Sequence, residues 1–415
     1  MVKAGYKQTE VGEIPEDWEL NPIGQHFDFK NGLNKSKEYF GHGTPIINYM
    51  DVFSNPGLAN SDITGKVAVT KDEINSYSAR KGDVFFTRTS ETVDEIGLST
   101  VLTEEVKDAV FSGFVLRARE KGSDLGLHFK KYCFRSESAR KQIKATSSYT
   151  TRALTNGKLL SQVLLAYPKD PDEQKAIADA LSDVDTLIAS LAKLIEKKRD
   201  IKTATMQQLL TGKKRLPGFQ KEWQIKKIEE LADIDPENLS STTNPLYEFR
   251  YVSLEDVDSG RLRGHSEQIF STSPSRARRV LRMNDVVIAT VRPNLKSHFL
   301  FQRNEKDWIC STGFAVIRCN PKKADAQFLF YHFFARQIDL QIETLIAGSN
   351  YPAINSGDVR KLEISCPEID EQAAIASVIS DMDKELHLLE EKRSKAKAIK
   401  QGMMQELLTG RTRLV

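Results

Sequence analysis

The sequence predicts an α/β protein with two globular domains, each a mixed, twisted β-sheet with helices, joined by two long antiparallel coiled-coil helices. Three observations lead to this fold class: a long segment that occurs twice, a heptad pattern in both copies, and short β-rich runs between them. The segment that follows the first copy has its counterpart at the N-terminus of the chain, as if the chain closed into a ring. We therefore expect a pseudo-twofold, almost circular organisation.

The repeated segment runs from Asp172 to Leu216 and again from Asp370 to Leu414, at a constant offset of 198 positions. Both copies begin with Asp-Glu-Gln and end with Leu-Leu-Thr-Gly followed by basic residues. The glycine of each ending stands where a helix stops, because glycine readily adopts the left-handed conformation that closes a helix. An internal duplication therefore sets the organisation of the chain.

Apolar residues recur three and four positions apart in both copies, which is the spacing of a coiled-coil seam. The predicted seam consists of Ile177, Leu181, Val184, Ile188, Leu191 and Ile195 in the first copy and Ile375, Ile379, Met382, Leu386 and Leu389 in the second. A single helix of this kind would be read as a dimerisation zipper. Two matched helices in one chain favour pairing with each other as a rigid strut of about 40 residues, or roughly 60 Å.

The remaining sequence supplies the two globular domains. The four expected parts are residues 1–165 (first globular domain), 166–214 (first long helix), 215–365 (second globular domain) and 366–415 (second long helix). The strand-like run 82–90 is matched with 284–293, and the buried-strand pattern 111–119 with 311–319. A helical run follows in each domain, and then a polar loop rich in turn residues. We expect strands that support variable loops, where binding groups usually lie.

Composition narrows the function classes. With 415 residues, 40% of them hydrophobic, the chain can bury real cores, which argues against disorder, and its net charge of +3 neither requires nor excludes a polyanionic partner. The absence of an apolar signal segment or a run of about 18 apolar residues predicts a cytoplasmic protein without a membrane partner. Four cysteines and seven histidines show no metal-ligand spacing, so we expect free thiols and no metal.

Arginine, amide and hydroxyl side chains in the loops are candidate DNA-binding groups. Arginine forks match guanine edges and phosphates, asparagine can pair with adenine, and hydroxyls reach phosphates and bases. The candidates are Arg88, Thr89, Ser90, Thr92, Tyr149, Thr150 and Arg152 in the first domain and Arg276, Arg278, Arg292, Asn294, Lys296, Asn350 and Tyr351 in the second. Each residue taken singly is more often a solvated loop residue. The arginine-rich run 273–282 is a more pointed indication.

Catalytic motifs are missing from the sequence. It contains no phosphate loop, dinucleotide fingerprint, zinc-protease motif or nucleophile elbow. A loose nuclease-like set of Asp172, Glu196 and Lys198 lies on the first repeated helix, where such charges are usually solvated. We therefore predict no catalytic residues and no enzyme activity for this chain.

These features resemble the specificity subunit of type I restriction-modification systems. The resemblance is carried by the two repeated helices with their Asp-Glu-Gln and Leu-Leu-Thr-Gly ends, the opening YKQTEVGEIPEDWEL and the segment GDVFFTRTSET. It implies two target-recognition domains that each read one half of a split, asymmetric DNA sequence, held apart by an antiparallel coiled coil.

The resemblance also implies partners and cofactors. Two adenine-N6 methyltransferase subunits would bind this chain, motor-nuclease subunits would join them for restriction, and S-adenosylmethionine, ATP and Mg²⁺ would belong to those partners rather than to this chain. Three alternatives remain open at this point. They are a specificity-like adaptor of another phage-defence complex, a coiled-coil scaffold that binds no DNA, and a stand-alone nuclease.

Overall fold

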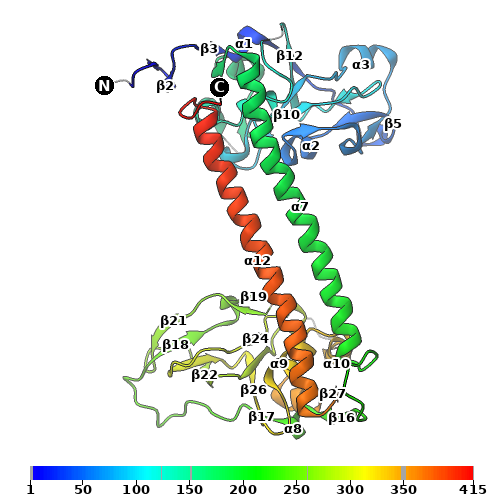
Figure 1. Ribbon diagram of the computed structural model, residues 1–415, viewed down its shortest axis with the longest axis vertical. Helices are drawn as coiled ribbons and strands as arrows, with labels where there is room; N and C mark the ends of the chain where they lie inside the picture. Colours follow the sequence, from blue (N-terminus) through cyan, green and yellow to red (C-terminus); the bar gives the residue numbers. More distant parts are fainter. Residues whose placement is uncertain (1–2, 123, 150–151, 259, 347–351, 415) are drawn as a thin grey trace. The chain divides into compact units, whose positions relative to one another are not determined.

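The computed structural model describes residues 3–122, 124–149, 152–258, 260–346 and 352–414 (Figure 1). The chain forms two compact units: unit 1 consists of Met1–Ala192 and Glu391–Val415, and unit 2 of Lys193–Glu390. Each unit therefore combines one globular domain with the start of one long helix and the end of the other. Within the described residues, no helix is both long and apolar enough to cross a membrane.

The main sheet of unit 1 has five strands in the order β4–β12–β8–β10–β6. These are β4 (Phe27–Asn31), β12 (Val115–Glu120), β8 (Val84–Thr87), β10 (Ser99–Leu102) and β6 (Gly57–Leu58). The sheet is mixed, since β10 and β6 are parallel while the other pairs are antiparallel. Every residue of β8 and β10 is buried, which fits the apolar sequence of β8, whereas β10 also buries the polar residues Ser99 and Thr100.

Smaller sheets and short helices complete the globular part of unit 1. The sheets are β11 (Val110–Phe111)–β5 (Phe40–Ile47)–β7 (Lys66–Val67), β13 (Ser148–Tyr149)–β14 (Ala153–Leu154)–β9 (Thr89–Ser90), β15 (Leu164–Pro168)–β3 (Trp18–Pro22) and β1 (Tyr6–Thr9)–β2 (Gly12–Pro15). The helices are α1 (Ile23–His26), α2 (Tyr49–Ser54), α3 (Lys71–Ser76) and α6 (Gly157–Ser161), with short 3₁₀ helices η1 (Lys37–Tyr39), η2 (Asn60–Asp62) and η3 (Val93–Glu95).

Unit 2 is built around two four-stranded sheets. One is β17 (Ala232–Ile234)–β26 (Phe314–Cys319)–β23 (Val286–Ala289)–β24 (Phe299–Leu300), and the other is β21 (Ser266–Ile269)–β18 (Glu248–Val252)–β25 (Trp308–Ser311)–β22 (Ala277–Val280). The pairs β16 (Gln224–Lys227)–β27 (Glu363–Cys366) and β19 (Val257–Asp258)–β20 (Arg261–Leu262), the helices α8 (Ile228–Leu231) and α11 (Ser356–Lys361), and the 3₁₀ helices η4 (Leu254–Asp256) and η5 (Pro293–Leu295) complete it.

The single helical run expected in each globular domain is two helices in the structure. Unit 1 has α4 (Lys130–Cys133) and α5 (Glu137–Thr146), and unit 2 has α9 (Ala326–His332) and α10 (Arg336–Ile346). In unit 1 the break has a local cause, because the Ser136 hydroxyl accepts a hydrogen bond from the backbone N–H of Ala139 at 3.3 Å and so begins α5.

The repeated segments form the long helices α7 (Pro171–Leu209) and α12 (Ile369–Leu407), each of 39 residues (Figure 1). Both begin a few residues after the expected positions, because β15 and β27 still belong to the globular sheets. Gly212 and Gly410 follow the helix ends with φ of +69° and +70°, the left-handed conformation in which glycine avoids the steric cost of a side chain.

Within each unit, the start of one long helix runs antiparallel to the end of the other. In unit 2, Lys202 Nζ lies 2.5 Å from Asp383 Oδ1. Arg199, which is earlier in α7, pairs with Glu390, which is later in α12, at 2.5 Å. The same reversed order of ion pairs holds in unit 1.

The predicted seam residues have two packing roles. Ile177 and Leu181 in unit 1, and Ile375 and Ile379 in unit 2, are buried in the core of their own globular domain. The end of the other long helix enters the same core, for example through Leu407 in unit 1. Toward the helix centres, Leu191, Ile195 and Leu386 are buried, whereas Val184, Ile188, Met382 and Leu389 are partly exposed. The outer seam residues thus anchor the helices in the domains.

The buried strands β12 and β26 are equivalent in the two units, but their residues correspond with a shift of one position from the alignment expected from the sequence. Asp83 in unit 1 binds Arg119, and Asp285 in unit 2 binds Arg318, each through two carboxylate–guanidinium hydrogen bonds. The expected offset of 200 positions between these strands is therefore wrong, and the matched ion pairs require 199. The expected alignment followed a Gly-Phe dipeptide near the start of both strands, but Gly113-Phe114 lies before β12, whereas Phe314 of Gly313-Phe314 is the first residue of β26.

Candidate nucleic-acid interface

Three of the candidate residues in unit 1 are brought together by one small sheet. The buried strand β8 ends at Thr87, and the chain continues into β9, where Thr89 pairs with Leu154 and Ser90 with Ala153 of β14. Arg152 precedes β14 directly and is exposed. The pairing of β9 with β14 therefore places Thr89, Ser90 and Arg152 on one surface, although more than sixty positions separate them in the sequence.

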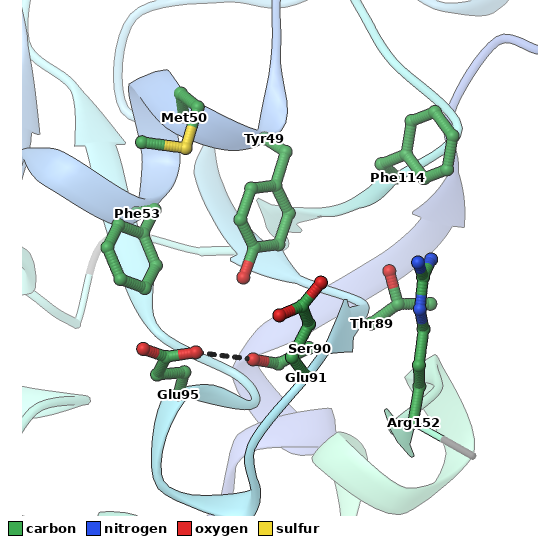
Figure 2. A pocket seen from close by; sticks show the side chains of 9 residues that line it. All are labelled: Tyr49, Met50, Phe53, Thr89, Ser90, Glu91, Glu95, Phe114 and Arg152. Carbon is green, nitrogen blue, oxygen red and sulfur yellow. Dashed lines mark hydrogen bonds between the residues drawn. The ribbon is translucent and has the colours of Figure 1, made fainter. Parts of the chain in front are cut away.

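These residues line a surface pocket of about 320 Å³. Figure 2 shows side chains from α2, from β9 and the loop after it, and from the loop before β12 around this space. Its lining residues are Tyr49, Met50, Phe53, Thr89, Ser90, Glu91, Glu95, Phe114 and Arg152. We call this set the unit 1 pocket.

The unit 1 pocket combines an apolar wall with hydrogen-bonding groups. The rings of Tyr49 and Phe53 stack with centroids 5.8 Å apart, and Ser90 Oγ donates to Glu95 Oε2 at 3.0 Å (Figure 2). Phe114 is 60% exposed and Met50 is 58% exposed, so large apolar groups remain open to solvent beside Arg152. Such a surface can contact a thymine methyl group or a base face, while Arg and carboxylate groups read base edges.

The other unit 1 candidates lie differently. Arg88 is half-buried, and its Nη1 lies 3.5 Å from the carbonyl oxygen of Gly113, so this guanidinium braces a loop rather than lining the pocket. Thr92 is exposed next to the pocket, and its backbone N–H donates to Ser90 Oγ at 3.4 Å. Tyr149 contributes its backbone to β13, where it pairs with Ala153. Thr150 lies outside the described residues.

The arginine-rich run of unit 2 is largely engaged within the domain. Arg279 Nη1 lies 2.5 Å from Asp235 Oδ2, and Arg282 Nε lies 2.7 Å from Glu237 Oε2. The Arg282 hydrogen bond is the main reason that the pKa of Glu237 is lowered. These two arginines therefore hold β22 in place.

The two arginines of this run that were predicted to bind DNA differ from each other. The Arg278 guanidinium lies 4.9 Å from the centroid of the Phe270 ring and donates to the carbonyl oxygen of Ala277 at 2.7 Å. Arg276 is exposed, and within the described residues it has no ion pair. Only Arg276 therefore offers its whole guanidinium to a ligand, whereas Arg278 offers a partly covered one.

A strained loop presents the remaining unit 2 candidates. Arg292 and Lys296 flank η5 with φ of +49° and +53°, a left-handed conformation that costs free energy for residues other than glycine. Arg292 and Asn294 are exposed, whereas Lys296 Nζ is 2.8 Å from Asp339 Oδ2 and is thereby held by the domain. Arg292 and Asn294 are therefore the candidate residues of this loop whose side chains are open to solvent. Asn350 and Tyr351 lie outside the described residues.

The loop surfaces of the two units differ at matched positions. In unit 1 the Ser112 hydroxyl accepts a hydrogen bond from the backbone N–H of Phe114 at 3.4 Å, and in unit 2 Ser311 accepts one from Gly313 at 3.1 Å. The exposed phenylalanine of unit 1 thus stands where unit 2 has a glycine. The phenylalanine that follows this glycine, Phe314, is completely buried. The two units therefore share this local backbone arrangement but expose different side chains from it.

Sequence reasoning missed the apolar part of the unit 1 pocket. Tyr49, Met50 and Phe53 come from α2, and their spacing looks like an ordinary short amphipathic turn. The indication that could have revealed them is the number of large apolar residues in a helix of only six residues, since such a helix cannot bury all of its sides. Phe114 was hidden by the alignment that matched it with the buried Phe314.

The chain thus has two α/β domains with one shared frame and different loop chemistry, and each packs against the ends of the long helices in its own unit. Residues 15–197 and 220–398 match the type I restriction modification DNA specificity domain, and the chain belongs to that family.

Known proteins of this family are similar to the chain along nearly its whole length. The type I restriction enzyme MjaVIII specificity subunit of Methanocaldococcus jannaschii is 22% identical over 99% of this chain and 96% of its own length. The solved S subunit from M. genitalium covers 94% of this chain and 96% of its own, with a TM-score of 0.56 at 15% identity. A chain from a structural study of complex assembly and conformational transition of the type I R-M system covers 96% and 99%, with a TM-score of 0.59 at 16% identity. These likenesses agree with the two-domain fold.

Proposed function

We propose that this chain reads a bipartite, asymmetric DNA target, one half with each unit, and directs adenine-N6 methylation and restriction by partner subunits. Two methyltransferase subunits bind the chain in this proposal, and motor-nuclease subunits join them in the restricting complex. S-adenosylmethionine, ATP and Mg²⁺ bind to those partners, and this chain contributes recognition without catalysis.

The observation that carries this proposal is the pair of reading surfaces on one repeated frame. Asp83, directly before β8, pairs with Arg119 of β12, and Asp285, directly before β23, pairs with Arg318 of β26, which supports a framework common to the two domains. Phe114 of unit 1 occupies the position that matches Gly313 of unit 2, and unit 2 has the loop from Arg292 to Lys296. Each domain therefore has its own pattern of polar and apolar side chains. Different patterns read different base sequences, so the two halves of the target should differ.

The repeated helices supply the spacing in this proposal. A protein that reads two separate sites needs a stiff connection, because flexible linkers would let the distance vary. We expect one heptad inserted in register into both α7 and α12 to lengthen the preferred gap by about 10 Å, or roughly 3 base pairs at about 3.4 Å each. A methylated sequence that kept its original gap would contradict this role of the helices.

The decisive experiment maps N6-methyladenine in the DNA of cells that carry this chain and its methyltransferase. We expect one split sequence with unlike halves and a fixed gap. If the chain co-purified with other proteins but not with a methyltransferase, the result would instead favour an adaptor in another defence complex. The absence of steeply salt-dependent DNA binding would favour a scaffold, because phosphate contacts make binding fall strongly with salt. Metal-dependent cleavage by the purified chain alone would favour a nuclease.

A further inference from the structure

A tyrosine, an aspartate and a lysine join three separate elements of unit 1. The Tyr132 hydroxyl of α4 donates to Asp185 Oδ2 of α7 at 2.9 Å. Lys400 Nζ of α12 lies 2.6 Å from the other oxygen of the same carboxylate, and 5.5 Å from the centroid of the Tyr132 ring. The Asp185 carboxylate therefore connects three parts of unit 1: the globular domain, the start of α7 and the end of α12.

Unit 2 contains the same arrangement with the two long helices exchanged. The Tyr331 hydroxyl of α9 donates to Asp383 Oδ2 of α12 at 3.0 Å. Lys202 Nζ of α7 lies 2.5 Å from Asp383 Oδ1 and 5.6 Å from the centroid of the Tyr331 ring. Because the geometry occurs twice, in units that differ in their loops, it belongs to the shared framework. We call each set of three residues a tie.

The phenols of the ties are buried, while the side chains of Asp185 and Asp383 remain 30% and 38% exposed. Tyr132 is completely buried and Tyr331 is 3% exposed. Burial, followed by the charge of the neighbouring aspartate, raises the pKa of both phenols, so each hydroxyl stays protonated and can donate. Reduced contact with solvent strengthens a hydrogen bond to a charged acceptor.

Each tie resists tilting of a domain on its helices. One carboxylate oxygen is bound by the globular domain and the other by the second long helix. A tilt of the domain therefore breaks the phenol contact in addition to shifting the core packing through residues such as Leu181 and Leu407. A domain of about 165 residues has a radius of gyration of about 15 Å, so a tilt of about 15° moves its surface by about 4 Å. That displacement exceeds one base-pair step of about 3.4 Å.

We propose that the two Tyr–Asp–Lys ties are positioning residues that set the angle of each DNA-reading domain on the long helices and thereby the accepted gap length. This inference rests on the proposed reading of a split target. The helices fix the length of the connection, and the ties fix how each domain stands on it. Loss of a tie should leave base recognition intact and widen the range of gaps.

The test uses the full chain bound to its methyltransferase subunits and a DNA library with fixed half-sites and variable gaps. Tyr132→Phe and Tyr331→Phe, separately and together, remove only the hydroxyl. We expect methylation at gaps one base pair longer or shorter to rise roughly fivefold relative to the preferred gap, the population shift that corresponds to one net hydrogen bond. The bases read within each half-site should stay the same.

Tyr247→Phe is the matched control, because the Tyr247 hydroxyl also donates to an aspartate, Asp307, at 2.8 Å, but within the globular domain alone. Lys202→Arg combined with Lys400→Arg, which keeps the ion pairs, should retain the wild-type gap. If the double Tyr→Phe variant is less stable to heat yet accepts the wild-type gaps only, the ties are merely stabilising and the inference is overturned. Failure of the wild-type complex to methylate any split sequence would instead refute the proposed function itself.

Discussion

Arg413 and Glu173 form a two-pronged ion pair that joins the end of the chain to the start of α7 within unit 1. Arg413 Nε lies 2.5 Å from Glu173 Oε1, and Nη2 lies 2.8 Å from Oε2. Trp18 Nε1 donates to the same carboxylate at 3.2 Å, and Arg413 also binds Asp17. Unit 2 repeats the arrangement with Arg215, Trp223 and Glu371. The Glu173 side chain is 1% exposed, so these partners replace the water that would otherwise solvate its carboxylate.

Arg413→Ala should destabilise unit 1 by about 3 kcal/mol, because it leaves the buried Glu173 carboxylate without its cation. Urea unfolding followed by hydrogen exchange of unit 1 segments measures the loss. Lys221→Ala is the control, since its ion pair with Glu368 is exposed and should be worth less than about 1 kcal/mol. An Arg413→Ala effect no larger than the control would show that solvent replaces the arginine.

Arg292→Ala should relax discrimination at one base position of the half-site that we propose for unit 2, by about 1–3 kcal/mol. Arg292 is exposed on the strained loop before η5, where no ion pair within the described residues holds it. Methylation of single-base target variants gives the measurement, and Arg336→Ala, at an arginine paired with Glu343, is the control. Equal weakening on every sequence, with a shallower salt dependence, would make Arg292 a phosphate contact instead.

Phe114→Ala should reduce selectivity at one position of the half-site that we propose for unit 1, by roughly fivefold, because the variant lacks an exposed ring able to cover a base or a thymine methyl group. No charge changes, so the salt dependence of DNA binding should stay the same. Selectivity is measured on the same target variants. Ile225→Ala, at a 70% exposed apolar residue of β16, should change nothing. Unaltered selectivity in Phe114→Ala would remove Phe114 from the reading surface.

Unit 2 should lose stability as the pH falls from about 6.5 to about 3. Burial lowers the pKa of His298 and of His332 to about 3, against an ordinary value of 6.5, so the unfolded chain binds protons that the folded unit cannot. The stability contribution is complete above the unfolded pKa and is lost on acidification, at about 1.4 kcal/mol per pH unit for each histidine.

His332→Leu tests this dependence, because it replaces a buried ring of similar size with an apolar side chain that cannot titrate. Urea unfolding at about pH 7 and about pH 5 should show an acid-induced loss smaller by about 2 kcal/mol in the variant. The same acid sensitivity in both proteins would mean that His332 is protonated in the folded unit.

The repeat and the helix stops could be predicted because they depend on local residue types. A heptad pattern and a glycine after Leu-Leu-Thr need no tertiary information to be read. The one-residue shift between β12 and β26 could not be read in this way. It is set by where Arg119 and Arg318 reach their buried aspartates, and the Gly-Phe dipeptides gave a misleading local match.

The candidate site was only partly predictable for a similar reason. Arg276 and Arg279 belong to the same arginine-rich run, and the sequence does not distinguish them. In the structure, however, Arg279 is paired with Asp235, which lies far earlier in the chain. The unit 1 pocket joins α2, β9 and the segment before β12, and no local pattern reports that meeting. Residue type identified the possible DNA contacts, whereas long-range packing decided which of them are available.

The division of the chain has a consequence for its synthesis. Unit 2 is one continuous segment, Lys193–Glu390, so it can fold as soon as that segment has left the ribosome. Unit 1 needs Leu407, Leu408 and Arg413 to complete its core and its ion pairs. The first domain to be translated is therefore the last to be finished, because the end of α12 completes its core.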